Sequence, residues 1–386
     1  MASRKSSIGL ILLLYAAGLG AAAQLGKIAT SFPMLRDAYP ASDATQGLLL
    51  SIVSFVGVAL GVVAGQLVAS LGYKRMLVLG LLLGGLMSLV QASLPNISIF
   101  LVSRLIEGAS HLAIVVAAPT LINQVTDPSH RYLSMTLWSS FFGVAFACLA
   151  LLAPVLTNGF GLGGFYGLHG AYMIVFAVIL LIAIPKIEAA ETPFPTLKNM
   201  IERHVSAYSS PYENPAALGW LFYTLTYVSI LTVMPPYLPE DQRIAVAAYL
   251  PLASILSSFL IGALIMRFWS AVAVVQIGFA AAALTAVWML FGGITANALM
   301  ALFIALGLVQ SASFAVIPEL NTSPEGQAHA TGAVAQMGNL GNSLGTPLLL
   351  GLVGIAGIFA LPVALVLLYV AAIACHAYTH RLRQRG

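Results

Sequence analysis

Long apolar runs alternate with short polar gaps along the whole chain. About twelve of these runs hold the roughly 20 residues that a helix needs to cross a hydrocarbon layer about 30 Å thick. Each run must be helical, because its backbone polar groups would find no water to bond within lipid. We therefore predict an all-α integral membrane protein with twelve transmembrane helices, near 7–29, 45–71, 76–94, 97–118, 132–156, 168–185, 215–235, 244–266, 270–291, 297–317, 328–353 and 355–379.

The longest polar gap lies at 186–214 and divides the predicted spans into two equal sets. A faint internal repeat at an offset of roughly 200 residues supports two parallel halves. In this repeat Gly57, Gly61 and Gly65 of the second span are echoed by Ser254, Ser258 and Gly262 of the eighth. We predict two pseudo-symmetric six-helix bundles, 1–185 and 215–386, joined by a cytoplasmic linker over 186–214.

The linker contains its own apolar pattern. Leu197, Met200, Ile201 and Val205 follow helical spacing, which predicts a short helix lying on the inner membrane surface. A solvated tether between the two bundles is the alternative.

Lys and Arg gather in every second gap, and the positive-inside rule then sets the orientation of the chain. With the N-terminus in the cytoplasm, the inside positions are Arg4, Lys5, Lys74, Arg75, Arg131, Lys186, Lys198, Arg203, Arg267, Arg381, Arg383 and Arg385. Only Arg36 and Arg243 fall clearly outside. We expect a multi-pass protein of the bacterial inner (plasma) membrane with both termini cytoplasmic.

The start of the chain has a second interpretation. Arg4 and Lys5 precede an apolar stretch that ends in three alanines at 21–23, which resembles a cleavable signal peptide. The stretch is longer than the apolar core of such a peptide, and the later spans keep the same orientation under either interpretation.

Composition narrows the class of protein further. The chain is 60% hydrophobic and 7% charged, which leaves no room for a soluble catalytic domain. The net charge of +4 comes from single or paired basic residues, which suit anionic lipid headgroups rather than nucleic acid. Cys148 and Cys375 lie far apart without metal-ligand spacing. Phosphate-loop, zinc-protease and serine-hydrolase motifs are absent from the sequence, so we expect no cofactor, no metal and no enzyme activity.

Two short motifs resemble a known family. The segment from Gly65 through Gly72 to Lys74 and Arg75 reads GQLVASLGYKR, similar to the G-x-L-x-D-x-x-G-R-K signature of the major facilitator superfamily. It follows the second span, where that family places it. Arg104-Leu-Ile-Glu107-Gly108 in the fourth span resembles the family's R-x-x-Q-G motif. The style resembles compact bacterial members, either drug:proton antiporters or the cyanate-permease-like branch.

The resemblance marks Gly65, Gly72, Lys74 and Arg75 as a candidate conformational latch. Gly65 would admit a close neighbouring helix and Gly72 would permit a tight turn, while the two cations suit a helix C-terminus and the inner leaflet. Ala69 stands where the family usually has Asp. The implied charge pair is therefore missing, and the alternative is a merely anchored turn.

Arg104, Glu107 and His111 form the most costly intramembrane cluster of the sequence. Their spacing of three, four and seven residues puts them on one helical face. Counted from Asn96, Glu107 lies about 15 Å deep at a rise of 1.5 Å per residue. We predict a proton-coupling site in which Glu107 or His111 carries the proton and Arg104 tunes the acid. The alternative is a permanent ion pair that locks the fourth helix.

Lys27 and Gln24 lie near the outer end of the first span. The default expectation for Lys27 is that it snorkels to the headgroups, and the alternative is a group that attracts anions at the mouth of a cavity. In the family the first, fourth, seventh and tenth spans line a central cavity. With polar and aromatic side chains elsewhere, this gives as candidate substrate-cavity residues Gln24, Lys27, Asn123, Trp138, Tyr223, Tyr227, Gln310 and Asn339.

These observations predict a secondary active transporter that moves a small organic solute by alternating access, coupled to protons, with efflux preferred. One alternative is an uptake permease for anions or small acids, in which Lys27 and Arg104 bind the substrate's negative charge. An alternative of another class is a membrane-embedded enzyme or a non-transporting receptor. We expect a monomer whose partners are a small-molecule substrate, protons and membrane lipids, with no nucleic acid.

Overall fold

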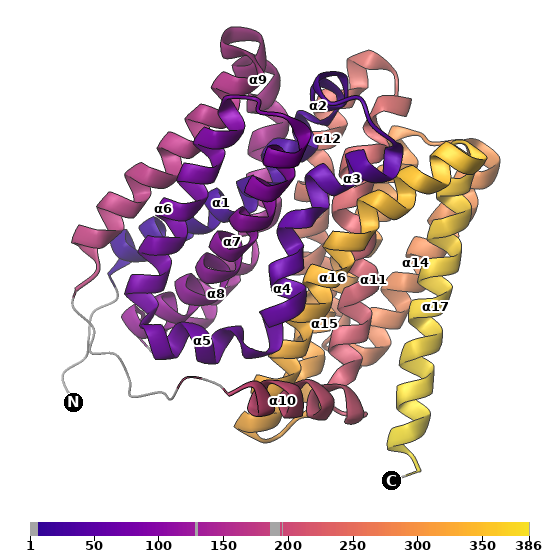
Figure 1. Ribbon diagram of the computed structural model, residues 1–386. Helices are drawn as coiled ribbons and strands as arrows, with labels where there is room; N and C mark the ends of the chain where they lie inside the picture. Colours follow the sequence, from indigo (N-terminus) through magenta and orange to yellow (C-terminus); the bar gives the residue numbers. More distant parts are fainter. Residues whose placement is uncertain (1–6, 128–129, 186–193, 195, 386) are drawn as a thin grey trace. The chain divides into compact units, whose positions relative to one another are not determined.

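The computed structural model describes the chain except residues 1–6, 128–129, 186–193, 195 and 386 (Figure 1). All regular elements of the described residues are helices. Eleven helices of this part of the chain are long and apolar enough to cross a membrane. The predicted all-α membrane fold is thus confirmed. Of the predicted inside cations, Arg4, Lys5 and Lys186 lie outside the described residues.

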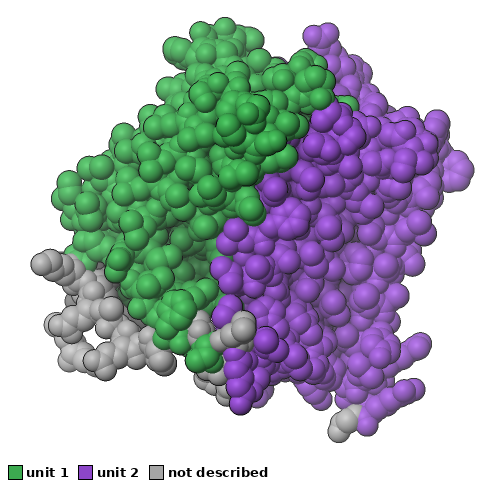
Figure 2. All heavy atoms as spheres, viewed as in Figure 1, with its two compact units in different colours: residues 1–40, 63–196 green, residues 41–62, 197–386 purple. Residues whose placement is uncertain are grey.

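The structure divides into two compact units, coloured separately in Figure 2. Unit 1 contains Met1–Pro40 and Val63–Thr196, and unit 2 contains Ala41–Val62 and Leu197–Gly386. The first part of the second predicted span therefore groups with the C-terminal helices. The division of the chain at 186–214 stays a prediction.

Unit 1 is a helical bundle. Its helices are α1 (Ile8–Thr30), α2 (Phe32–Ala38), α5 (Ala64–Leu71), α6 (Tyr73–Ala92), α7 (Ile97–Val125), α8 (Arg131–Ser139) and α9 (Phe141–Ala183). The long helices α1, α6, α7 and α9 pack against one another. Local sequence starts α7, since the Asn96 side chain accepts a hydrogen bond from the Ile99 amide at 3.1 Å.

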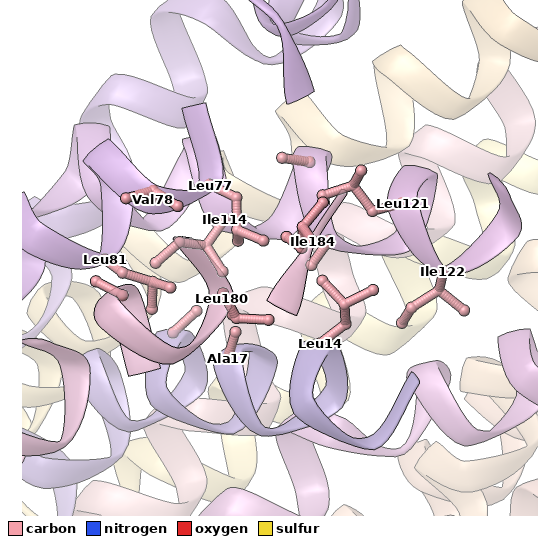
Figure 3. Packing of buried hydrophobic residues seen from close by; sticks show 14 of the residues in the cluster. Leu14, Ala17, Leu77, Val78, Leu81, Ile114, Leu121, Ile122, Leu180 and Ile184 are labelled. Atoms are coloured by element: carbon pink, nitrogen blue, oxygen red, sulfur yellow. The ribbon is translucent and has the colours of Figure 1, made fainter. Parts of the chain in front are cut away.

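One end of this bundle has an apolar core. Side chains from α1, α6, α7 and the end of α9 point toward one another there (Figure 3). The labelled members of this core are Leu14, Ala17, Leu77, Val78, Leu81, Ile114, Leu121, Ile122, Leu180 and Ile184. The remaining part of the same four helices carries polar side chains in the interior. Each helix therefore has an apolar stretch and a polar stretch.

Unit 2 is also helical. Its elements are α3 (Asp43–Ser51), η1 (Ile52–Ser54), α4 (Phe55–Leu60), α10 (Leu197–Ser209), α11 (Asn214–Val233), η4 (Pro235–Tyr237), α12 (Glu240–Leu256), η5 (Ser257–Gly262), α13 (Ala263–Ile265), α14 (Ala271–Gly292), α15 (Ala296–Leu320), α16 (Pro324–Ala356) and α17 (Ala360–Arg383). Helix α16 packs along α11 and against α3 and α4, while α14 packs on α15 and α17. Ser270, Thr295 and Ser323 cap α14, α15 and α16.

The fifth and sixth predicted spans are joined in α9. This helix covers 43 residues, about 65 Å at 1.5 Å per residue and hence twice a membrane crossing. The expected connector at 157–167 is helical apart from Gly161, where φ is 70° and ψ is 177°. Only glycine adopts this conformation readily, so Gly161 separates two crossings. With α9 counted as two, the described spans reach the predicted twelve.

The second and eighth predicted spans are less regular than expected. The second is interrupted by the 3₁₀ turns η1 and η2 (Gly61–Val63), and the eighth contains a π-helical turn, η5. The fourth span is longer than the predicted 97–118, because α7 continues through Pro119 to Val125. The predicted linker helix is present as α10.

Candidate functional site

The polar stretch of unit 1 contains a buried charge cluster. We use this name for the side chains of Lys27 on α1, Ser88 and Gln91 on α6, Arg104 and Glu107 on α7, and His169 on α9. The Lys27, Arg104 and Glu107 side chains are 0% exposed. Their burial places three formal charges inside a helical bundle.

Glu107 is the centre of the cluster. Its Oε1 accepts hydrogen bonds from the Lys27 ammonium at 2.8 Å and the Ser88 hydroxyl at 3.2 Å. Its Oε2 accepts from the Gln91 amide at 2.9 Å and from Arg104. The Ser88 hydroxyl has one hydrogen, and both Glu107 Oε1 and His169 Nδ1 lie within its reach. Lys27, Gln91 and Arg104 are therefore the three donors that Glu107 does not share with His169 through Ser88. Arg104 and Glu107 thus form a buried ion pair, and the proton-coupling role of Arg104, Glu107 and His111 stays a prediction.

Lys27 does not snorkel to the headgroups, so that default expectation is wrong. Its ammonium donates to Glu107 and to the Ser88 hydroxyl at 2.6 Å, and lies 3.3 Å from His169 Nδ1. These three acceptors match its three hydrogens. The reason is that the Glu107 carboxylate, which lies beside the ammonium within the bundle, is a stronger partner than a distant headgroup.

The charges of the cluster do not cancel. Lys27 and Arg104 contribute two positive charges and Glu107 one negative charge when the histidines are neutral. Arg104 also donates to the Gln24 carbonyl at 2.8 Å, which disperses part of its charge over a neutral acceptor. Removing Glu107 would leave two buried positive charges uncompensated, which costs about 3–5 kcal/mol.

The two histidines have different surroundings. His169 Nε2 lies 3.0 Å from the Gly20 carbonyl, so this nitrogen carries the hydrogen, and its Nδ1 faces Ser88 at 2.8 Å as an acceptor. His111 Nδ1 faces the Ala21 carbonyl at 3.1 Å and the Gln24 Oε1 at 3.2 Å. His169 therefore joins the charge cluster directly, whereas His111 contacts it through Gln24.

Sequence reasoning missed Ser88, Gln91 and His169. The family's architecture directed attention to other spans. A signal was available, because Ser88 and Gln91 lie three residues apart in an apolar run and His169 is a titratable residue within another. Among the described residues, no three His, Cys, Asp or Glu side chains are grouped as a metal site would require.

The candidate latch is partly explained by local geometry. Gly72 adopts a φ of 89° between α5 and α6, which is the tight turn expected of it. Lys74 donates to the Ile184 carbonyl at 2.5 Å and so caps the end of α9. A Cβ placed at Gly65 would meet no atom of its unit within 4 Å. The close helix expected at Gly65 is therefore not found within the unit.

The remaining cavity candidates lie in diverse environments. Trp138 on α8 is buried and stacks on Phe141 at 4.5 Å, whereas Asn123 is exposed in the last turns of α7. Asn339 on α16 lies against Gly57 of α4. Trp138 and Asn123 belong to unit 1 and Asn339 to unit 2, and their role in a cavity stays a prediction.

Three other candidates meet in unit 2. Tyr223 and Tyr227 on α11 have ring centroids 5.1 Å apart. The Tyr223 hydroxyl donates to Gln310 Oε1 on α15 at 3.2 Å, and the Ser254 hydroxyl donates to the same oxygen at 3.3 Å. The structure therefore joins Gln310 of the tenth predicted span to Tyr223 of the seventh.

Comparisons with known proteins add a family and a fold. The family model described as Major Facilitator Superfamily matches residues 8–346. The 4-hydroxybenzoate transporter PcaK of Pseudomonas aeruginosa is 30% identical over 176 residues, which is 45% of this chain and 38% of that protein. The galactose-proton symporter of Escherichia coli is 26% identical over 169 residues, 44% of this chain and 35% of that protein. The aligned part thus spans well under half the length of these relatives.

A solved structure extends the fold comparison to nearly the whole chain. A bacterial homologue of the human lysosomal transporter Spinster, in an inward-facing and unoccupied conformation, superimposes with a TM-score of 0.75. The match covers 97% of this chain and 96% of the other at 16% sequence identity.

Proposed function

This chain belongs to the major facilitator superfamily, and from that premise we propose that it is a proton-coupled secondary transporter that moves a small organic solute across the membrane by alternating access. The family and the fold indicate a transporter rather than an enzyme. Efflux is the proposed direction, supported by the general resemblance of the chain to compact bacterial members such as drug:proton antiporters.

The observation that carries the proposal is the buried charge cluster. Ionisable groups inside a membrane bundle are costly, and they mark proton relays and substrate pathways. Glu107 is the acid at the centre of the cluster, and Lys27, Arg104 and His169 surround it. A relative, the galactose-proton symporter, moves its substrate with protons, as its name states.

The geometry suggests how a proton and a conformational change are linked. Lys27, Gln91 and Arg104 donate to Glu107, and the two cations among them favour its charged form, so a proton binds the carboxylate readily only if the Lys27 ammonium leaves. Departure of the Lys27 ammonium would also break its contacts with Ser88 and His169. Protonation of Glu107 therefore loosens α1 from α6, α7 and α9, which is the coupling that alternating access needs.

Replacement of Glu107 tests this proposal. Glu107→Gln should abolish solute-driven proton movement in proteoliposomes that contain a pH-sensitive dye and receive a panel of small organic solutes, while membrane insertion is retained. Glu202→Gln on α10 is a matched control, since that carboxylate is exposed. The double variant Lys27→Gln/Glu107→Gln keeps the net charge of the cluster and separates coupling from folding. Proton movement at the normal rate in Glu107→Gln would rule Glu107 out.

The excess positive charge of the cluster supports a second candidate function. An anionic substrate would neutralise it, as in an uptake permease for anions or small acids. The relative PcaK is named a transporter of 4-hydroxybenzoate, which is an organic acid. Under this candidate, Arg104→Gln removes substrate binding itself, whereas a pure coupling role predicts that binding persists.

A membrane enzyme or a receptor is distinguished by solute counterflow. Exchange of a labelled solute without chemical change supports the carrier, and product formation would support an enzyme. We further propose a monomer in a bacterial inner membrane with both termini cytoplasmic, and we keep the latch and cavity residues named above as candidates for that mechanism.

A further inference from the structure

The helices α11 and α15 of unit 2 present an amide and a group of aromatic rings at one place. Trp220 stacks on Tyr223 with ring centroids 4.5 Å apart and planes 20° apart. The ring centroids of Trp220 and Phe314 are 4.8 Å apart, and their planes are inclined by 65°. Gln310 lies one helical turn from Phe314 on α15 and bonds to Tyr223. The four side chains therefore form a continuous surface, which we call the aromatic–amide patch.

The amide of Gln310 has a fixed orientation. Its Oε1 accepts from two hydroxyls, those of Tyr223 and Ser254. The amide nitrogen carries two hydrogens and points away from these donors. Both hydrogen bonds that the structure shows for Gln310 use its Oε1, and the residue is half-buried. Gln310 thus offers a hydrogen-bond donor whose direction is already set.

Gln310 lies far from the end of α15, so the surroundings of its amide N–H groups need an explanation. The residue lies ten positions before the end of α15 at Leu320, about 15 Å along the helix. An amide N–H that faced lipid at this depth would have no water to bond, which is unfavourable. This face of α11 and α15 must therefore meet water or a ligand for part of the transport cycle.

The rings beside the amide select the shape of that ligand. Phe314 is 46% exposed, whereas Tyr223 and Tyr227 are 5% and 4% exposed. Trp220 stacks on the buried Tyr223, and Phe314 packs against Trp220. An exposed ring held by such neighbours favours a flat partner that stacks on it. We propose that the aromatic–amide patch is a subsite for a planar aromatic solute whose exocyclic carbonyl or carboxylate oxygen accepts a hydrogen bond from Gln310. The inference rests on the proposed transport function, since it names the class of solute carried.

Two uncharged amides of similar size test the subsite on the purified full-length protein. Benzamide and cyclohexanecarboxamide share the acceptor, and only benzamide has a flat ring. In equilibrium binding followed by tryptophan fluorescence or thermal shift, benzamide should bind about 3–10-fold more tightly. Equal binding of the two compounds, or no saturable binding of benzamide, overturns the inference.

Two variants test separately how the Gln310 amide and the Phe314 ring contribute to binding. Gln310→Met keeps the side-chain volume and should weaken benzamide binding about 3–10-fold. Phe314→Leu should remove the preference for the flat ring and leave binding of cyclohexanecarboxamide unchanged. Gln276→Met on α14 is the matched control, because Gln276 is a half-buried amide within about 10 Å of its helix start. This variant should bind benzamide as tightly as the unaltered protein does.

A structural role for Gln310 would give a different result. Tyr223→Phe keeps the ring stack and frees the amide, so it should weaken benzamide binding less than Gln310→Met does. Should Gln310→Met bind benzamide as well as the unaltered protein, the subsite is wrong. The Glu107 experiment measures proton movement independently, so the subsite can fail while the proposed coupling stands, and the reverse outcome is equally visible.

Discussion

At the scale of single residues, the chemistry of this protein depends on how Lys27 is neutralised. A lysine near the end of an apolar span usually reaches the headgroups. Here its ammonium lies 2.8 Å from Glu107 in a fully buried site. Arg104 shares the same carboxylate, so the charge balance of the cluster decides the consequence of each substitution.

That balance predicts an order of stabilities. Glu107→Gln leaves two buried cations with no anion and should lower the free energy of unfolding by about 3–5 kcal/mol. Lys27→Met leaves a neutral Arg104–Glu107 pair and should cost only about 1–2 kcal/mol. Thermal unfolding in detergent, followed by tryptophan fluorescence, checks the order. Equal or greater destabilisation by Lys27→Met would contradict this account of the cluster.

At the scale of elements, small residues decide which helices approach closely. A Cβ at Gly61 would lie 2.7 Å from the Cα of Gln336 on α16, and one at Gly57 would overlap Asn339. Gln336 in turn donates to the Val58 carbonyl at 2.5 Å. Gln336 and Asn339 of α16 therefore form a seam against the glycines of the second span.

The seam predicts unequal effects of similar substitutions. Gly61→Ala should destabilise the protein by about 1–3 kcal/mol, because the backbone of α16 cannot yield cheaply. Gly65→Ala in the same glycine series should be neutral or stabilise by up to about 1 kcal/mol, since it gains helix propensity in open space. Unfolding curves of the two variants test the contrast, and equal losses would argue against the seam.

The linker helix α10 is held by one side chain in particular. The Tyr208 hydroxyl donates to Gln336 Oε1 at 2.6 Å, and burial raises the pKa of Tyr208 to about 12. The hydroxyl therefore remains a donor at physiological pH.

Removal of this hydroxyl should loosen the linker helix. Tyr208→Phe should lower the opening free energy of α10 by about 1 kcal/mol, seen as roughly fivefold faster hydrogen exchange of its amides. Ser209→Ala is the control, because Ser209 is exposed and bonds only within α10. Unchanged exchange in Tyr208→Phe would show that other contacts hold the helix.

At the scale of the whole molecule, the basic residues predict how the chain is oriented in the membrane. Lys198 on α10 is exposed and belongs to the predicted inner side. Asp241 at the start of α12 is exposed next to Arg243, which belongs to the predicted outer side. The two positions should therefore differ in access from outside the cell.

Cysteine labelling measures that difference. In a background with Cys148→Ala and Cys375→Ala, Asp241→Cys should react with a membrane-impermeant maleimide on intact cells. Lys198→Cys should react only after the cells are made permeable. The opposite pattern would reverse the proposed orientation and place both termini outside.

The sequence by itself determined the fold class, since the length and spacing of apolar runs leave helices as the only way to satisfy the backbone in lipid. It also determined that Arg104, Glu107 and His111 share a face, because helical spacing is local. Tertiary structure decided that Lys27 and His169 join Glu107, that the glycines of the second span receive Gln336 and Asn339, and that Gln310 meets Tyr223. These contacts link positions tens to hundreds of residues apart, and periodicity within one helix carries no information about which face of which other helix it meets.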